Sequence, residues 1–214
     1  MKKAIVIGAT GMVGTQLIQL LIGNEDFSEI VTLVRRKSGV SNPKLTEYII
    51  NFDEPETWKN YVTGDVLFST MGTTMAQVKT KKAQYDVDFN YQFTVAKIAA
   101  NNGVSSYVLV SSAGANPTSK NFYLKMKGEL EFAVQSLPFK TVIILQPGQL
   151  TGNRIHNRRS EKIGIIIMDG LNKLGLFKRY KPIHAFTVAS AMIKAVKVKV
   201  SSIYSLDEIF KLAD

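Results

Sequence analysis

Tyr123 and Lys127 are the residues of this chain whose types and spacing best fit acid–base chemistry. Residues four apart share one face of a helix, so their side chains can converge on one small molecule. An ammonium beside a phenol group lowers the pKa of the phenol, which lets a tyrosine exchange a proton with a carbonyl or alcohol oxygen. In a lysine-rich chain this spacing also arises by chance, in which case the pair would be an ordinary part of a helix.

A serine pair ends the apolar run at 107–111 and precedes Tyr123. The hydroxyl of Ser112 could hydrogen-bond the same reacting oxygen and orient it, with Ser111 as the reserve candidate. We therefore expect the catalytic residues to be Ser112, Tyr123 and Lys127.

Three glycines, Gly8, Gly11 and Gly14, lie between an apolar run at 3–7 and a helical pattern at 12–21. The first would permit a tight turn, the second would let the backbone approach a pyrophosphate, and the third would let the helix pack against the sheet. The first N–H groups of the helix would bind the phosphates. An ordinary turn without a ligand is the alternative. The expected cofactor-binding residues of this turn are Gly8, Thr10, Gly11, Met12, Val13 and Gly14.

The residues after the second strand distinguish between two dinucleotides. NAD-binding domains usually place an acid there, about 20 residues beyond the glycines. Here Arg35 and Arg36 follow Val34 instead. A carboxylate would repel a 2′-phosphate, whereas a guanidinium can bind it with two hydrogen bonds. The sequence therefore predicts NADP rather than NAD, unless these cations only decorate a loop.

Apolar runs alternate with helical patterns through the first two thirds of the chain. Several runs are continuous in Val, Ile and Leu, which is typical of parallel strands buried on both faces. The expected strands are 3–7, 30–34, 45–50, 66–69, 107–111 and 141–146, and the expected helices are 12–21, about 83–100 and about 122–136. This alternation predicts an α/β fold, a single-domain doubly wound parallel sheet of the Rossmann type.

Residues 149–184 are basic and less regular, and we expect them to form a small C-terminal cap within one domain, 1–214. A helix near 161–174, a helix at 185–197 and a short edge strand at 202–205 are predicted. Arg154, Arg158, Arg159 and Lys162 could bind an anionic substrate or simply form a solvated loop. We assign the apolar run 163–168 to the core. For His184 we expect a structural role.

Composition excludes several classes of protein. The chain has no cysteine and two histidines, so disulfides, thiolate catalysis and a metal site are not expected. No apolar run is long enough to span a membrane. The net charge of +10 is dispersed, which indicates a solvated basic surface and argues against nucleic-acid binding. A cytoplasmic protein is the default expectation.

Several short motifs resemble one protein family. Val-Ser-Ser-Ala-Gly-Ala (110–115), Tyr-Leu-x-x-Lys-Gly-Glu (123–129), Gln-Pro-Gly (146–148) and Met-Gly-Thr-Thr (71–74) are similar to atypical short-chain dehydrogenase/reductases. Their branch is that of the Tat-interacting oxidoreductase-like protein and its small bacterial relatives. The resemblance implies NADP(H) binding and a Ser-Tyr-Lys triad. Ser112 lies only eleven positions before Tyr123, shorter than in classical members, which puts the geometry of the triad in doubt.

The resemblance adds further cofactor contacts. Residues after the third strand would meet the adenine, with Asp53 accepting a hydrogen bond and Phe52 offering an apolar face. Residues after the fourth strand would line the central ribose. Asn90 matches an asparagine that supports the site in extended members. The added cofactor-binding residues are Phe52, Asp53, Met71, Gly72, Thr73 and Pro147.

Two functions follow as expectations. The first is an NADP-dependent oxidoreductase that acts on a small carbonyl or alcohol. Its substrate could be anionic, and the protein could form a homodimer. The small substrate region argues against sugar-nucleotide substrates. The alternative is a non-catalytic NADP(H)-binding redox sensor or regulatory protein.

Overall fold

Seven parallel strands form the central sheet of the computed structural model, which describes residues 1–152 and 181–214. Their order across the sheet is β3-β2-β1-β4-β5-β6-β9. Each neighbouring pair is parallel. The strands are β1 (Lys2–Ile7), β2 (Phe27–Val34), β3 (Leu45–Ile49), β4 (Val66–Ser69), β5 (Ser106–Val110), β6 (Thr141–Gln146) and β9 (Ser202–Ser205).

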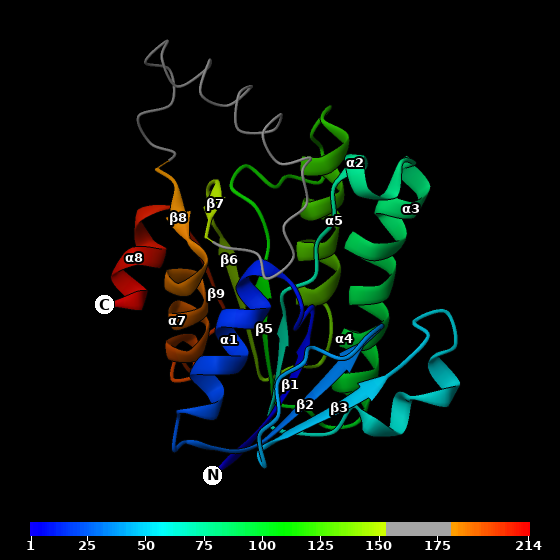
Figure 1. Ribbon diagram of the computed structural model, residues 1–214. Coiled ribbons are helices and arrows are strands. Elements are labelled where there is room, and N and C mark those ends of the chain that lie inside the picture. Colours follow the sequence, from blue (N-terminus) through cyan, green and yellow to red (C-terminus); the bar gives the residue numbers. More distant parts are fainter. Residues whose placement is uncertain (153–180) are drawn as a thin grey trace.

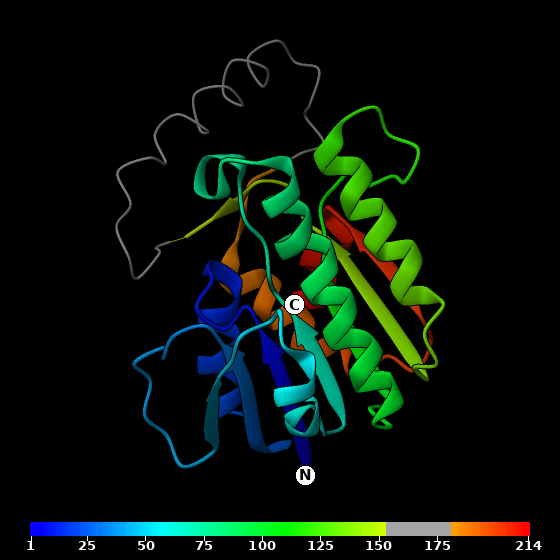
Figure 2. The same cartoon turned by 90° about the vertical axis from the view of Figure 1, so that its right-hand side faces the viewer.

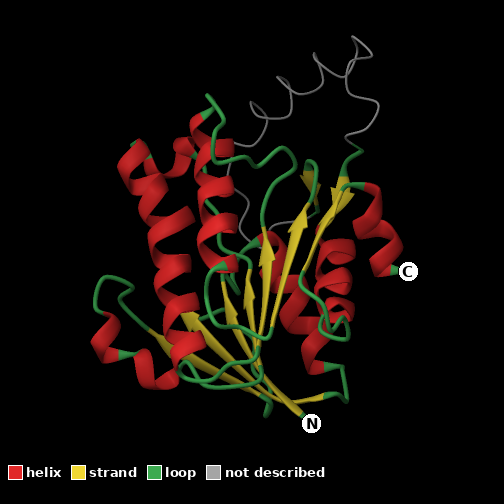
Figure 3. Ribbon diagram, turned by 180° about the vertical axis from the view of Figure 1, so that it is seen from behind, coloured by secondary structure: helices red, strands yellow, loops and turns green. Residues whose placement is uncertain are grey.

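Helices cover both faces of this sheet (Figures 1 and 3). On one face α1 (Met12–Ile22) packs against α7 (Ala185–Ala195), and α8 (Asp207–Ala213) packs beside α7. On the other face α4 (Tyr91–Asn101) and α5 (Phe122–Gln135) lie side by side, as Figure 2 shows. Short turns η1 (Pro55–Thr57) and η2 (Lys59–Tyr61) follow β3. The fold class predicted from the sequence is confirmed.

The hydrophobic core has two halves, one on each face of the sheet. Along β1 the fully buried Ala4 and Val6 face the α1 and α7 side, while Ile5 and Ile7 face the α4 and α5 side. Because successive side chains of a strand point to opposite faces, a strand covered on both faces must be apolar throughout. This explains the continuous apolar runs of the sequence.

The helix expected at 83–100 differs from the prediction. After the short α2 (Met75–Val78), the chain forms α3 (Lys81–Tyr85), a π-helical turn η3 (Asp86–Asn90) and then α4. A π turn holds one more residue than an α turn and so rotates everything that follows about the helix axis. The sequence pattern indicated neither this turn nor α2 nor α8.

The segment between β7 (Leu150–Thr151) and β8 (Ile183–His184) is largely outside the described residues. The helix expected near 161–174, the apolar run 163–168 and the basic residues Arg154, Arg158, Arg159 and Lys162 all fall there. β7 and β8 themselves pair in parallel, so the two ends of this segment meet.

The strand order places a topological switch point at β1. The chain leaves β1 for α1 on one face and leaves β4, its neighbour, for α2 to α4 on the other face. The loops diverge between these two carboxyl ends, where sheets of this type bind ligands. Several of the candidate residues lie at this edge.

Candidate functional site

The first turn can be built only with glycine. Gly8 has φ +79°, and a Cβ at this position would lie 2.5 Å from the carbonyl carbon of Thr70. A Cβ at Gly14 would lie 2.1 Å from the carbonyl oxygen of Gly8. The loops after β1 and β4 therefore touch, and α1 starts directly against the turn.

The N-terminus of α1 has the properties of an anion site. Gly11 occupies the N-cap position without a capping side chain, and the first turn of the helix has no acidic residue. Thr10 is exposed, Met12 is half-buried and Val13 is buried. The first N–H groups of the helix are thus left for a phosphate, and the glycines keep the approach free of side chains. The turn fits the pyrophosphate of a dinucleotide.

Arg35 and Arg36 follow β2 and are both exposed. Among the described residues, neither forms an ion pair. Burial and a hydrogen bond to Asp53 raise the pKa of Tyr91, while the positive charge of Arg35 acts against this rise. Arg35, Tyr91 and Asp53 therefore lie near one another on the β2 and β3 side of β1.

Phe52 and Asp53 have different environments. The ring of Phe52 is only 5% exposed, with its centroid 6.0 Å from that of Trp58 and 5.3 Å from that of Tyr91. It therefore packs in the core and does not present the open apolar face that we expected. Asp53 is exposed and accepts a hydrogen bond from the Tyr91 hydroxyl at 2.9 Å.

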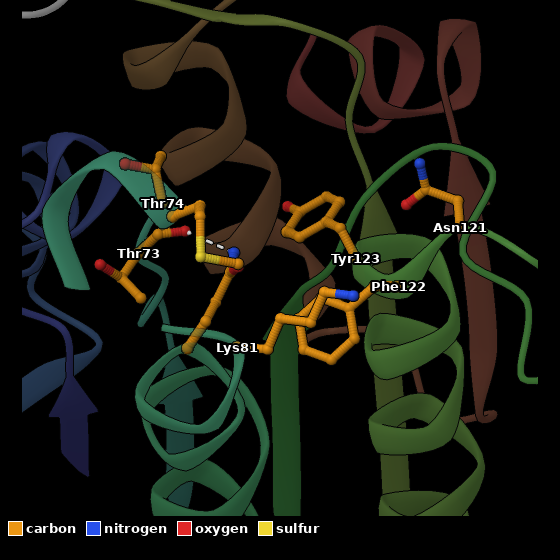
Figure 4. A pocket seen from close by; sticks show the side chains of 8 residues that line it. Thr73, Thr74, Lys81, Asn121, Phe122 and Tyr123 are labelled. Carbon is orange, nitrogen blue, oxygen red and sulfur yellow. Dashed lines mark hydrogen bonds between the residues drawn. The ribbon is translucent and has the colours of Figure 1, made fainter. Parts of the chain in front are cut away.

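Tyr123 lies in the first turn of α5 and lines a pocket of about 460 Å³. In Figure 4 its hydroxyl points across this pocket toward the segment that carries Thr73 and Thr74. The side chain is 37% exposed, so a ligand can reach it. The residues lining the pocket are Thr73, Thr74, Met75, Lys81, Gln84, Asn121, Phe122 and Tyr123.

Lys127 lies one turn further along α5 and is 2% exposed. Its ammonium lies 2.9 Å from the Oδ1 of Asp88 and 5.9 Å from the centre of the Tyr123 ring. Burial alone would lower the pKa of Lys127, but the electrostatic effect of Tyr123 and of the Asp88 carboxylate outweighs burial and raises it. Lys127 is therefore held in its charged form beside Tyr123.

The two serines after β5 have different partners. The buried Ser111 donates a hydrogen bond to Glu131, which also accepts hydrogen bonds from Gln146 at 2.9 and 3.0 Å. Burial raises the pKa of Glu131. Ser112 is half-buried, and within the described residues its hydroxyl has a single 3.4 Å contact, with the carbonyl oxygen of Ala113. Of the two hydroxyls, that of Ser112 is the less occupied.

The loop after β5 is fixed to α5 and to the loop after β6. The Ala113 N–H donates to the carbonyl oxygen of the buried Pro147 at 2.9 Å, and the Asn116 N–H donates to that of Leu124 at 3.0 Å. A Cβ at Gly128 would lie 2.3 Å from the carbonyl carbon of Asn116. Gly128 thus lets the loop that carries Ser112 lie directly on the helix that carries Tyr123 and Lys127.

The loop after β4 joins this arrangement through Asp88. The Thr73 N–H donates to the Oδ2 of Asp88 at 2.9 Å. Gly72 lies close by, since a Cβ there would be 3.6 Å from the Oδ1 of Asp88, and Met71 packs against the core. Asn90 is exposed and donates to Asp86 at 2.8 Å.

Two charged residues of the site were missed in the sequence. Asp88 and Glu131 are 0% and 6% exposed, which is unusual for carboxylates and requires partners. The spacing of Glu131, four residues after Lys127, was an available signal.

His184 caps α7, its Nδ1 accepting the Phe186 N–H at 3.2 Å, so it has a structural role.

Two further observations hold for the described part of the chain. Within residues 1–152 and 181–214, no three His, Asp or Glu side chains cluster so as to hold a metal ion. No helix in these ranges is long and apolar enough to cross a membrane.

Comparison with known proteins identifies the family. A family model described as NAD(P)H-binding matches residues 8–197. The mitochondrial protein FMP52 of Coccidioides immitis is 33% identical over 180 residues, which cover 78% of this chain and 73% of that protein. FMP52 of Saccharomyces cerevisiae, also named mitochondrial, is 35% identical over 162 residues, covering 74% and 70%.

These names overturn the expectation of a cytoplasmic protein, because the relatives are mitochondrial. The expectation was a default that relied largely on the lack of cysteines. Since many proteins outside the cytoplasm also lack disulfides, cysteine content could not decide the location.

Solved structures agree with the fold. A UDP-glucose 4-epimerase of Thermotoga maritima, solved with UDP-glucose, has a TM-score of 0.71 at 15% identity and covers 99% of this chain and 81% of its own. The enzyme WbmH of Bordetella bronchiseptica, in complex with NAD+, has a TM-score of 0.71 at 16% identity, covering 96% and 76%. At such identities the likeness shows the fold alone. The family model and the FMP52 relatives show that the chain belongs to the NAD(P)H-binding family.

Proposed function

We propose that the protein is an NADP-dependent oxidoreductase that acts on a small carbonyl or alcohol. The observation that carries the proposal is the placement of Tyr123. Its hydroxyl faces an open pocket while the charged Lys127 lies one turn away, at the same sheet edge as the glycine turn.

The cofactor would lie along the carboxyl edge of the sheet. Gly8, Gly11 and Gly14 would hold its pyrophosphate at the N-terminus of α1, and the exposed Arg35 and Arg36 would bind the 2′-phosphate. When bound, the nicotinamide supplies or accepts the hydride.

Residues at the pocket would transfer the proton to or from the substrate oxygen. In reduction, the Tyr123 hydroxyl donates a proton to the carbonyl oxygen of the substrate, and Lys127 stabilises the phenolate that remains. Ser112, whose hydroxyl is weakly occupied, would hydrogen-bond the same oxygen.

The charge of the pocket favours an anionic substrate. Among the residues that the structure describes, its lining includes one cation, Lys81, and no acid. The Lys81 ammonium lies 5.5 Å from the centre of the Phe122 ring, so a carboxylate could meet the cation while an apolar group contacts Phe122 and Met75. We therefore propose small carbonyl compounds that carry a carboxylate.

The test uses Tyr123→Phe. Oxidation of NADPH is followed over a panel of carbonyl compounds in which each carboxylic acid is paired with its methyl ester. We expect the parent to reduce acids faster than esters, and Tyr123→Phe to lose about 10²-fold or more in rate with little change in NADPH affinity, because one proton donor is removed. Tyr61→Phe, an exposed tyrosine stacked on Tyr48, is the control. Turnover at the parental rate in Tyr123→Phe would refute the mechanism.

A non-catalytic NADP(H) sensor is the second candidate. The observation in its favour is that Asp88 already pairs with the Lys127 ammonium, which leaves less of the positive charge to act on Tyr123. This candidate predicts tight NADPH binding without NADPH oxidation by any compound of the panel.

A further inference from the structure

Asp88 is a fully buried carboxylate between two segments of the proposed site. Its Oδ1 lies 2.9 Å from the Lys127 ammonium on α5. Its Oδ2 accepts the Thr73 N–H, in the loop after β4, at 2.9 Å. With 0% of its surface exposed, the side chain is enclosed by the protein and contacts both segments.

The backbone of Asp88 is fixed as well. Asp88 belongs to the π turn η3, a rare geometry that is often found at functional sites. Its carbonyl oxygen accepts the Gln92 Nε2 at 2.7 Å, and the Gln92 Oε1 accepts the Ser69 hydroxyl at 2.7 Å. A continuous set of contacts thus runs from the end of β4 through Gln92 and Asp88 to Lys127.

Burial makes Asp88 and Lys127 depend on each other. A charge buried without a partner is strongly unfavourable, so neither side chain can leave this arrangement at low cost. The ion pair therefore holds the loop after β4, the π turn and α5 at one point. This point lies on the β4 and β5 side of β1, whereas Arg35 and Asp53 follow β2 and β3 on the other side.

We infer that Asp88 is a positioning residue for the nicotinamide half of the cofactor. It would fix the Lys127 ammonium and the backbone of Thr73, the two groups that face this half, and would have no part in binding the adenosine half. The inference rests on the proposed NADP site, but it does not depend on turnover.

The test compares two ligands in Asp88→Asn. NADPH binding is measured by nicotinamide fluorescence, and binding of 2′,5′-ADP, which lacks the nicotinamide half, by calorimetry. We expect the Kd of NADPH to rise about tenfold, or about 1.4 kcal/mol, and that of 2′,5′-ADP to stay within about twofold. Asp86→Asn is the matched control: it removes the same charge from the same turn, where Asp86 pairs with Lys82 at 3.0 Å. We expect it to change neither Kd.

Parental NADPH affinity in Asp88→Asn would overturn the inference, and so would an equal loss for both ligands, because that would indicate a general effect on the fold. If Asp88→Asn does not fold, Asp88→Glu is measured instead, because it keeps the buried charge and displaces the carboxylate by one methylene group. The same split is then expected, and parental NADPH affinity would again overturn the inference. A parent protein that binds neither ligand would instead refute the proposed NADP site, and the inference with it.

Discussion

Arg35 and Asp53 carry opposite charges beyond the ends of two neighbouring strands, β2 and β3. Both charges act on Tyr91: its hydroxyl donates a hydrogen bond to Asp53, and the charge of Arg35 opposes the rise in its pKa that burial causes. The acid is thus engaged by a tyrosine, while the guanidinium of Arg35 is exposed. At the scale of single residues, this arrangement supports the proposed preference for a ligand with an extra phosphate.

Replacing Arg35 tests this preference. Arg35→Glu should weaken NADPH binding by about 10- to 100-fold and leave NADH binding nearly unchanged, because a hydrogen bond to a charged group contributes about 1.5–3 kcal/mol. Fluorescence titration with both cofactors measures the ratio. Lys97→Glu makes the same charge change on the exposed surface of α4. An unaltered NADPH-to-NADH ratio in Arg35→Glu would contradict the assignment.

The buried Glu131 gives the protein a pH-dependent stability. Because burial raises its pKa in the folded state, the folded protein binds the proton more tightly than the unfolded chain does. The contribution of Glu131 to stability is therefore greatest below the unfolded pKa of about 4.3 and declines as the pH rises above it. Glu131→Gln removes this decline.

Thermal unfolding at several pH values measures the effect. The Tm of Glu131→Gln minus that of the parent should increase between pH 4 and pH 7. Asp214→Asn changes an exposed terminal carboxyl and should give a constant difference. A difference for Glu131→Gln that falls with rising pH would show the opposite sign.

At the scale of elements, the contact of α5 with the loop after β5 determines where Ser112 lies relative to Tyr123. Gly128 permits this contact because a side chain there would meet the backbone of Asn116. Residues 111–121 are also held by the Asn116 hydrogen bond to Leu124. The short serine-to-tyrosine spacing noted in the sequence is thus accommodated by a loop that lies flat on the helix.

Gly128→Ala should therefore destabilise the protein by about 1–3 kcal/mol, the usual effect of forcing an extra carbon into a packed site. Urea unfolding measures this change. Gly23→Ala is the matched control, because a Cβ at Gly23 would approach only the Gln19 and Leu20 carbonyl oxygens, at 3.8 and 3.9 Å. Equal stability of the two variants would show that the loop moves without cost.

At the scale of the whole molecule, the sequence predicted the fold more fully than the site. Continuous apolar runs and glycines are local signals, so the strands and the turn at Gly8 could be located from them. The position of Asp88 could not, because the extra residue of the π turn rotates the helix face by about 100° relative to a regular helix. The burial of Phe52 and the hydrogen bond between Ser111 and Glu131 likewise depend on packing between distant segments.

The pairing of β7 with β8 has a consequence for how this architecture can diversify. Leu150 and Ile183 pair in adjacent parallel strands, so the two described ends of the segment between β7 and β8 lie close together. Adjacent strands are about 4.8 Å apart. A connection between parallel strands needs about a dozen residues or more, so a piece of at least that length can join these two ends and leave the central sheet undisturbed. The piece between β7 and β8 can therefore vary among relatives while the cofactor-facing edge of the sheet stays intact.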